Sequence, residues 1–423
     1  MNWNAPQKSI IHVLFQFVYT LFQFIYKLFH FNSRNCQSGI IQESMNFCQR
    51  RNDSIKRHVA NNSRRTPFNL LEAQQDIVST CTANAGLSYT TTLTTINTDV
   101  GGSHKYFACV LTPGGIIYGI PRYTSYILRL DTNTDTVTKL AYGNNKRWDA
   151  AALSPDMKYL YLSPCTVNAI YKLDLETDTL SSFGTINTSS EYKYFASITS
   201  SNGNIYMASY SGLGMMEIDP ADDSYTVYSN GTSTIADADY RLFLDMNGNI
   251  LSPGGGRNIY KFDIETKCFS LHTSSPVGLG GGADYNIGAD GNYYGLGRNS
   301  AGLPYLVKVS STTGLFDSSV ISLDSSPARS TYTLSCLAPN GRIYYQLNGS
   351  NGTPVISIGL NGTVVSETTF SVATQCMMLA PNGSIYCLPR DGTPIYKISF
   401  TYSGGEPRMF KESTLLSPLM NRG

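Results

Sequence analysis

The sequence has few of the groups that acid–base catalysis or metal binding requires. Only five histidines occur in 423 residues, and His12, His30 and His58 lie near the N-terminus, which leaves His104 and His272 for the rest of the chain. General acid–base chemistry and metal coordination need several such groups at one place. This count leaves no histidine cluster on which an active site could be built.

Metal-site spacings and catalytic motifs are also absent from the sequence. The nine cysteines are scattered, without a Cys-x-x-Cys pair or a Cys/His ligand spacing, so neither a zinc site nor a disulfide framework is indicated. No G-x-S-x-G, H-E-x-x-H, P-loop or EF-hand pattern occurs, and the glycine-rich run at 278–284 lacks the strand and helix of a dinucleotide loop. The sequence therefore predicts a protein that is not an enzyme and has no cofactor and no metal.

Charged residues are scarce and unevenly placed. They make up 14% of the chain, against 41% hydrophobic residues, 37 glycines and 29 tyrosines, a composition typical of a turn-rich globular β-protein. Residues 1–80 contain nine Lys/Arg and four Asp/Glu, so this part carries +5 and the remainder −4. The acidic balance of the remainder argues against nucleic-acid binding by the main body of the protein.

Residues 10–31 form a separate hydrophobic segment, long enough as a helix to cross a bilayer core of roughly 30 Å. Its polar residues recur every three or four positions, which predicts a helix with one polar stripe. The stripe consists of His12, Gln16, Thr20, Gln23, Lys27 and His30. We assign residues 1–35 to this helix, which could span a membrane as a signal anchor, lie on a membrane surface, or pack against a partner. A cleaved signal peptide is the least favoured alternative, because no small-residue cleavage site follows.

Residues 36–86 are predicted to be a basic linker. Its basic residues are Arg50, Arg51, Lys56, Arg57, Arg64 and Arg65. If the helix spans a membrane, they would hold the following chain in the cytoplasm. They could also attract anionic lipid or nucleic acid, or simply belong to a solvated flexible linker. With the preceding helix, the linker favours a membrane- or virion-associated protein over a free soluble one.

A short module recurs seven times between residues 112 and 388. The modules are TPGGIIYGI at 112–120, SPDMKYLYL at 154–162, SSNGNIYMA at 200–208, DMNGNILSP at 245–253, GADGNYYGL at 288–296, APNGRIYYQ at 338–346 and APNGSIYCL at 380–388. Asn-Gly and Asp-Gly supply the positive φ values of a two-residue type I′ turn, and the alternating apolar residues around them predict a β-hairpin. A third strand, a polar turn and a fourth strand follow each hairpin.

The spacing of the modules predicts the architecture. Successive modules are 42 to 50 residues apart, which matches the four-stranded blade of a β-propeller. We therefore predict an all-β, seven-bladed propeller over residues 87–417, followed by a tail at 418–423. An open ring would expose two sheet edges, so we expect LSYTTTLTTI at 87–96 to complete the last blade as its outer strand.

The repeats resemble the YVTN-type propeller family. Residues 154–180, SPDMKYLYLSPCTVNAIYKLDLETDTL, are closest to that pattern, and PNGxIY is the recurring turn of the other repeats. The resemblance covers roughly residues 107–400 and implies a propeller fold, which occurs in surface-layer proteins, secreted binding modules, viral and phage structural proteins, and quinoprotein-like enzymes. Propeller-type antibiotic lyases have similar turns, but this chain lacks their channel histidines. The fold alone does not decide among these functions.

A candidate ligand face lies where the innermost strands begin. Aromatic residues recur there, three of them preceded by a cation, and arginines recur in the loop after the second strand. The candidate residues are Lys105, Tyr106, Arg122, Arg147, Trp148, Lys193, Tyr194, Asp239, Tyr240, Arg298, Tyr332 and Arg390. Rings that stack on sugars and arginines that bind carboxylates would suit an anionic glycan or a protein partner with an acidic segment. Alternatively, the rings pack between blades, and carboxylates such as Asp149 pair with the cations.

The sequence favours a non-enzymatic propeller that binds a ligand or builds a structure, attached to a membrane, virion or larger assembly through residues 10–31. Two alternatives stay open. A channel-mouth lyase or hydrolase would show converging carboxylates with perturbed pKa values. A nucleic-acid-associated protein would bind through the basic linker.

Overall fold

The computed structural model divides the chain into two compact units, Met1–Ala60 and Asn61–Gly423, and all the residues described below belong to the second. The described ranges are 68–98, 104–143, 147–188, 190, 192–209, 212–229, 241–253, 258–274, 285–298, 304–323, 333–347 and 353–421. The predicted helix at 10–31 and the basic residues between 50 and 65 lie outside these ranges. Within them, no helix is long and apolar enough to cross a membrane.

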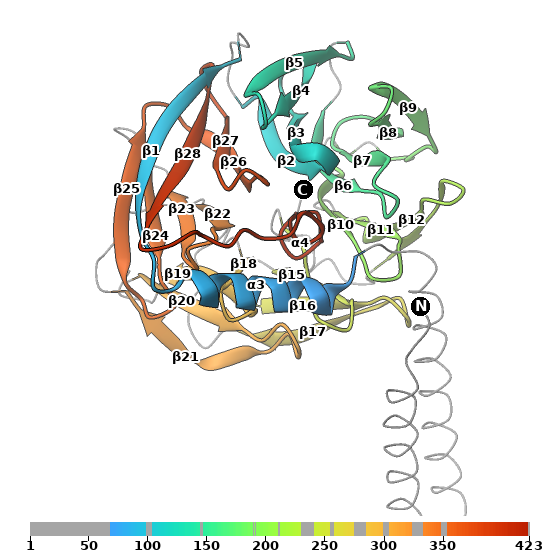
Figure 1. Cartoon of the computed structure of the whole chain (residues 1–423). Helices are drawn as coiled ribbons and strands as arrows, with labels where there is room; N and C mark the ends of the chain where they lie inside the picture. The colour runs from blue at the N-terminus through green and yellow to red at the C-terminus, as the bar shows by residue number, and fades with distance from the viewer. Residues whose placement is uncertain are drawn as a thin grey trace, which may run out of the picture. The chain divides into compact units, whose positions relative to one another are not determined.

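Seven antiparallel four-stranded sheets form the blades of the predicted propeller (Figure 1). Blade 1 contains β2 (Tyr106–Thr112), β3 (Ile116–Pro121), β4 (Tyr126–Asp131) and β5 (Thr136–Ala141); blade 2 contains β6 (Trp148–Leu153), β7 (Tyr159–Pro164), β8 (Ile170–Asp174) and β9 (Thr179–Phe183); blade 3 contains β10 (Tyr194–Thr199), β11 (Ile205–Ser209), β12 (Met215–Asp219) and β13 (Ser224–Tyr228). Blade 4 contains β14 (Phe243–Leu244), β15 (Ile250–Pro253), β16 (Asn258–Asp263) and β17 (Cys268–Ser274); blade 5 contains β18 (Tyr285–Ile287), β19 (Tyr293–Arg298), β20 (Pro304–Val309) and β21 (Phe316–Ser322). Blade 6 contains β22 (Thr333–Leu337), β23 (Ile343–Leu347), β24 (Thr353–Ile358) and β25 (Val364–Phe370); blade 7 contains β26 (Thr374–Leu379), β27 (Ile385–Pro389), β28 (Pro394–Ser403) and β1 (Ser88–Asn97).

The ring closes by the strand exchange that the sequence predicts. Strand β1 pairs with β28 along its whole length, from Ser88 opposite Ser403 to Asn97 opposite Pro394. Blade 7 therefore combines the first strand of the propeller with its last three, in the order β1-β28-β27-β26. This pairing removes the two sheet edges that an open ring would leave exposed.

Burial falls from the centre of the ring to its rim. All six residues of the innermost strand β6 are buried, whereas the outermost strand β9 alternates between exposed and half-buried residues. The innermost strands have neighbouring blades on both faces, which explains continuous apolar runs such as Ala150-Ala151-Ala152. The hydrophobic core therefore lies between the blades, around the channel.

The turn of each repeated hairpin differs from the predicted two-residue type I′ turn. In blade 3 the N–H of Gly203 donates to the carbonyl of Ser200 at 3.0 Å, and Gly203 has a φ of 85°. Asn202 is not among the residues with positive φ, so the turn is a type I turn followed by one left-handed residue. Asn202 Oδ1 instead accepts a hydrogen bond from the N–H of Asn204 at 2.9 Å. The Asn-Gly pair is needed because asparagine braces the turn while glycine takes the left-handed position.

The PNGxIY turn also connects neighbouring blades. Asn382 Nδ2 donates to the hydroxyl of Tyr386 at 2.9 Å, and this hydroxyl donates to Asp135 Oδ1 of blade 1 at 2.6 Å. Lys397 completes the group at 2.6 Å from Asp135 Oδ2. Burial alone would raise the pKa of Asp135, but hydrogen bonds from Lys397 and Tyr386 lower it. The same tyrosine–aspartate contact joins Tyr118 to Asp178 and Tyr161 to Asp223.

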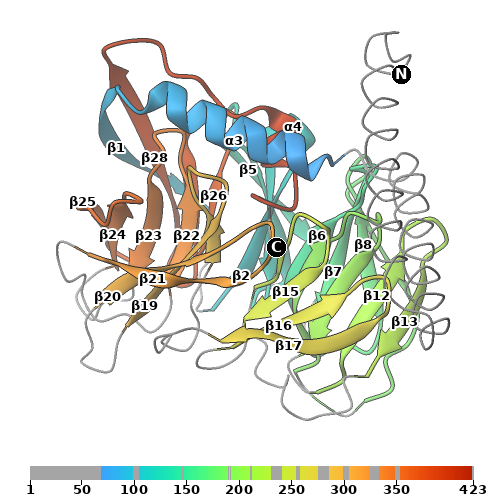
Figure 2. The same cartoon turned by 90° about the horizontal axis from the view of Figure 1, so that it is seen from below.

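Helix α3 (Leu70–Asn84) and the C-terminal segment (residues 406–421, including α4, Glu412–Leu415) cover one face of the ring. We call this the turn face, because the hairpin turns lie there: Gln74 Nε2 donates to the carbonyl of Gly291, and Glu412 Oε1 accepts from the N–H of Gly114. In Figure 1, α3 crosses the ring and the C-terminal segment ends over its centre, and Figure 2 shows both on the same side of the blades. We call the opposite face the open face.

These two elements change the boundaries expected from the sequence. Residues 70–84, placed in the basic linker 36–86, form a helix whose Ala73, Ile77 and Cys81 are buried in the propeller core. The tail predicted from residue 418 is also packed in place, because Leu419 is fully buried. Apolar residues at helical spacing, which the overall basic character of the linker obscured, account for α3.

Candidate binding face at the open end of the channel

Side chains at the channel mouth are positioned by a repeated irregularity in the innermost strands. In β2, β6, β10 and β26 the pairing with the second strand skips one residue near the open face. The skipped residues are Phe107, Asp149, Phe195 and Gln375. A bulge re-aims the side chain of its extra residue, so these four are turned away from the regular alternation of the strand.

Three of the bulge residues surround Arg122, which follows β3. The guanidinium carbon of Arg122 lies 4.4 Å from the ring centre of Phe107 and 5.5 Å from that of Phe195. Arg122 Nε is 3.2 Å from Asp149 Oδ1, a contact that is an ion pair without the alignment of a hydrogen bond. The arginine side chain is only 14% exposed and the carboxylate is buried. Stacking and charge pairing together hold this arginine in place.

The outer part of the cluster is open to solvent. Arg147 lies over the ring of Tyr123, with its guanidinium carbon 4.1 Å from the ring centre. Tyr192 packs edge-on against Phe195 at 5.8 Å between ring centres. Tyr123 and Tyr192 are 45% and 37% exposed, which is high for such large rings. We call Phe107, Arg122, Tyr123, Arg147, Asp149, Tyr192 and Phe195 the mouth cluster.

Asp149 is the titratable group at the base of this cluster. Burial raises its pKa to about 6, and the charge of Arg122, the Cys165 thiol and the charge of Arg147 oppose this only in part. The same burial, with the charge of Asp149, raises the pKa of the Cys165 thiol. The cluster therefore has two arginines against one carboxylate, and this carboxylate becomes neutral in mildly acidic solution.

Backbone hydrogen bonds explain why the cluster spans several blades. The N–H of Lys105 donates to the carbonyl of Arg390 in blade 7, and the carbonyl of Lys105 accepts from the N–H of Arg122. The same contact recurs between blades 3 and 2, where the N–H of Lys193 donates to the carbonyl of Cys165. Cys165 thus occupies in blade 2 the place that Arg122 and Arg390 occupy in blades 1 and 7.

The two lysines predicted to contact a ligand do not line the face. Lys193 is buried, and its Nζ donates to the carbonyls of Ser190 at 2.7 Å and Thr166 at 3.3 Å. Lys105 is also buried and donates to the carbonyl of Gly392. Each ammonium group donates to backbone carbonyl oxygens in the neighbouring loops, because a buried charge needs such partners.

The aromatic residues that open the innermost strands are buried as well. Tyr106, Trp148 and Tyr194 have at most 1% of their surface exposed. Trp148 packs against Tyr142 and Tyr171, with ring centres 4.8 and 5.2 Å away. These rings therefore pack inside and between blades, as the alternative interpretation of the sequence expected.

Of the other predicted residues, the structure describes the side chain of one and leaves out those of four. Arg390 lies near the mouth and pairs with Asp391 at 2.8 Å. Arg298 ends β19, but its side chain lies outside the described part of the structure. Asp239, Tyr240 and Tyr332 also lie outside the described residues. Of the twelve candidates, Arg122 and Arg147 are the two that the structure brings together in the mouth cluster.

Four aromatic residues of the cluster were missed in the sequence. A signal for two of them was present, because KYFA occurs at both 105–108 and 193–196 and places Phe107 and Phe195 at equivalent positions. Their importance depends on the bulge, which reverses the direction of the side chain. Tyr123 and Tyr192 lie in loops outside the repeat, where periodicity gives no information.

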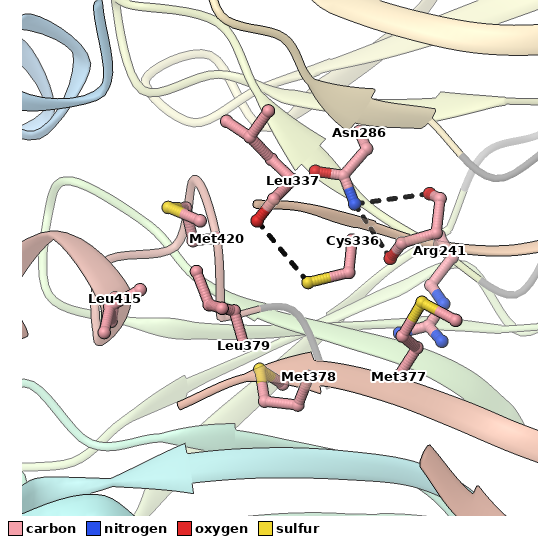
Figure 3. Close-up of a pocket in the computed structure, with 10 residues that line it drawn as sticks. Arg241, Asn286, Cys336, Leu337, Met377, Met378, Leu379, Leu415 and Met420 are labelled. Atoms are coloured by element: carbon pink, nitrogen blue, oxygen red, sulfur yellow. Dashed lines mark hydrogen bonds between the residues drawn. The ribbon is translucent and has the colours of Figure 1, made fainter. Parts of the chain in front are cut away.

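A small cavity lies inside the channel among blades 4 to 7 (Figure 3). Its volume is about 20 Å³, enough for a water molecule but too small for a larger ligand. Arg241, Asn286 and Ser335 contribute polar side chains to it, and Leu415 and Met420 of the C-terminal segment line it too. Asn286 Nδ2 donates to the carbonyl of Ser335 at 2.9 Å, so this amide is part of the packing between blades.

The thiols and carboxylates of the described residues do not form a metal site. No group of three metal-ligating side chains occurs in this part of the chain. None of the seven cysteines described is in a disulfide, and Cys109, Cys336 and Cys376 are buried. Burial is the largest cause of the raised pKa of Cys376, as expected for a thiol that packs in a core.

Comparisons with known proteins establish the fold. No protein-family model and no curated protein matches the chain. Among solved structures, a streptogramin B lyase matches with a TM-score of 0.60 and 15% identity, over 74% of this chain and 98% of its own. A catalytically inactive virginiamycin B lyase from Staphylococcus aureus with quinupristin matches with a TM-score of 0.58 and 12% identity, over 73% and 99%. The extracellular domain of a hybrid two-component system protein from B. thetaiotaomicron gives 0.53 and 12%, over 73% and 42%.

These matches confirm a seven-bladed β-propeller and go no further. At 12 to 15% identity they show a shared fold, and the fold carries both enzymes and an extracellular domain among the proteins matched.

Proposed function

We propose that this propeller, of the YVTN type, is a non-enzymatic binding module that takes an anionic glycan at its open face. The observation that carries the proposal is the exposure of Tyr123 and Tyr192, with the guanidinium of Arg147 stacked on the first of these rings. The face of an aromatic ring is electron-rich and attracts the C–H groups of a sugar ring. The guanidinium of Arg147, next to such a ring, would bind a sulfate or carboxylate of the same ligand.

An acidic peptide is the competing ligand for the same surface. Its carboxylates would bind the arginines, but it would gain little from the exposed rings of Tyr123 and Tyr192, which lie on different loops. Arg122 is also largely enclosed and already paired with Asp149, which leaves Arg147, stacked on Tyr123, as the cation of the cluster that a ligand would use. One such cation beside an exposed ring fits a sugar with a single charged substituent better than it fits a run of carboxylates.

Retention on immobilised glycans tests this proposal. The full chain should bind heparin and not uncharged dextran, and Arg147→Gln should lower the salt concentration at which it elutes from heparin. Equal retention of the variant would overturn the assignment of the site. Preferential binding to poly-glutamate over heparin would instead identify an acidic protein segment as the ligand.

The second part of the proposal is attachment to a membrane, virion or larger assembly through residues 10–31. It is supported by the sequence alone, through the length and polar stripe of that segment. Flotation with liposomes and size measurement of the full chain, each compared with a chain lacking residues 1–67, test it. Loss of flotation or of assembly on truncation is expected, and identical behaviour of both chains would contradict it. Salt-sensitive binding to nucleic acid that is lost on truncation would favour the linker alternative.

A channel-mouth lyase or hydrolase is a second candidate, favoured by one specific observation. Asp149 is a buried carboxylate whose pKa is raised to about 6, the condition of a general acid or base near neutral pH. Two of the matched structures are lyases, one named for streptogramin B and the other for virginiamycin B. Turnover of a bound glycan that disappears in Asp149→Asn while binding persists would support this candidate over simple binding.

A further inference from the structure

The C-terminal segment is packed into the turn face as a peptide ligand would be. It leaves the end of β28 through Gly404 and Gly405, and residues 404–409 are exposed except for the half-buried Pro407. From Thr414 to Leu419 every residue is buried. Leu415 and Leu416 are 2% and 4% exposed, and Leu419 is fully buried. The apolar side chains therefore enter the mouth of the channel while the connection to the propeller stays in solvent.

Helix α3 supplies a buried carboxylate that holds the segment. Asp76 is 3% exposed and accepts hydrogen bonds from the N–H of Lys411 at 2.9 Å and from the hydroxyl of Thr414 at 2.8 Å. Arg408 Nη2 lies 3.1 Å from the other oxygen of this carboxylate. A buried carboxylate with three donors from one short segment is a specific recognition contact.

A buried amide on α3 makes a second contact with the segment. Asn84 Oδ1 accepts from the N–H of Arg408 at 2.8 Å, and its Nδ2 donates to the carbonyl of Arg408 at 2.7 Å. The amide thus pairs with both backbone groups of one residue, which is how a side chain holds an extended peptide. Asp76 and Asn84 lie eight residues apart on one helix and bind the segment at two places.

The innermost strand of blade 1 holds the end of the segment in the same way. Asn421 Oδ1 accepts from the N–H of Leu111 at 2.9 Å, and Asn421 Nδ2 donates to the carbonyl of Leu111 at 2.6 Å. Both groups lie on the edge of β2 that faces the channel, where no further strand can pair. Leaving these two groups unpaired would be costly at a buried site.

We propose that α3 and the turn-face mouth of the channel form a peptide-binding site, and that the C-terminal segment is its tethered occupant and closes the channel. The site takes a short helical segment with buried leucines, a hydroxyl for Asp76 and an amide for Leu111. Leu415 and Met420 of the bound segment form part of the wall of the cavity in Figure 3. This site is separate from the mouth cluster and does not depend on its function.

Cleavage of the folded protein tests the proposal. A protease recognition sequence is inserted at Gly404–Gly405 of the full chain, the protein is cut after folding, and a fluorescent synthetic peptide of residues 406–423 is added. We expect the cut segment to exchange with the labelled peptide, with saturable binding and an unchanged near-ultraviolet circular dichroism spectrum. Exchange that occurs only with loss of this spectrum, or release of the segment without binding of the peptide, would show that the segment is an inseparable part of the fold and overturn the proposal.

Peptide variants sharpen the result. Asn421→Leu keeps the size of the side chain but removes both hydrogen bonds to Leu111, so it should weaken binding by about tenfold or more. Ser413→Ala changes an exposed residue for which no side-chain contact is described, and it should bind like the original peptide. Equal affinity of all three peptides would contradict the assigned contacts.

Discussion

Arg122 Nε lies 3.2 Å from Asp149 Oδ1, although the arginine belongs to blade 1 and the aspartate to blade 2. The aspartate reaches the arginine because it is the extra residue of the β6 bulge. The pair therefore ties two blades together and at the same time sets the charge of the mouth cluster.

Loss of the arginine should destabilise the protein most at high pH. Arg122→Gln leaves the buried carboxylate of Asp149 without its main counter-charge, which typically costs about 3 kcal/mol. At pH 5 the carboxyl group is mostly protonated, since its pKa is about 6, and the cost should be much smaller. Denaturant unfolding of the variant and the original protein at pH 8 and pH 5 measures both values. A cost that is the same at the two pH values would contradict the pairing.

Replacement of the aspartate should remove one component of the pH dependence. The pKa of Asp149 is raised from 3.8 to about 6, so between these values the folded protein binds a proton that the unfolded chain does not. This group therefore makes the protein less stable as the pH rises from about 4 to above 6. The Asp149→Asn variant lacks this loss of stability. Relative to the original protein, its free energy of unfolding should therefore rise over this pH window and level off at higher pH. A difference that is constant with pH would rule out the raised pKa.

Lys193 tests whether buried cations contribute to binding. Lys193→Met should leave the carbonyls of Ser190 and Thr166 unpaired and destabilise the protein by about 1–3 kcal/mol. It should not change retention on heparin, because the ammonium group does not reach the open face. Lys158→Met, at an exposed lysine on the turn face, is the matched control and should affect neither property. Loss of heparin binding in the first variant alone would restore the ligand role that the sequence suggested.

In the contact between blades 3 and 4 the charges are reversed, because the turn residue is a lysine and the strand residue is a glutamate. Swapping the two charges tests this contact. Lys267 lies 2.6 Å from Glu217 of blade 3, at the turn position where other blades carry Asp135, Asp178 or Asp223. Lys267→Asp should destabilise the protein by about 1 kcal/mol through repulsion between two carboxylates. Adding Glu217→Lys should recover most of this loss. Thermal unfolding of the single and double variants gives the coupling, and independent effects of the two changes would contradict it.

The architecture could be predicted because each blade repeats the same local chemistry. Asn382 and Tyr386 illustrate this, since one braces the turn and the other links to the next blade, and both therefore recur at a fixed spacing. Closure by β1 followed from the need to cover a sheet edge. The turn type was wrong because glycine alone, and not the asparagine before it, takes the left-handed conformation.

The candidate site was less predictable because it depends on departures from the repeat. A single extra residue in β2 and β10 turns Phe107 and Phe195 toward Arg122, while Tyr106 and Tyr194, which the periodicity singled out, are buried. The lysines before them looked like surface cations, but the chain folds loop carbonyls around their ammonium groups. No count of residue types contains this information.

Calorimetric titration of the full chain with a heparin-derived oligosaccharide tests the central claim most directly. Three proteins are compared: the original, Tyr123→Ala/Tyr192→Ala, and Tyr126→Ala, which removes a similarly exposed ring outside the mouth cluster. The account predicts measurable binding by the first and third proteins and a loss of at least about tenfold in affinity for the second. Equal affinity of all three proteins, or no binding by the original, would contradict a glycan site at the open face.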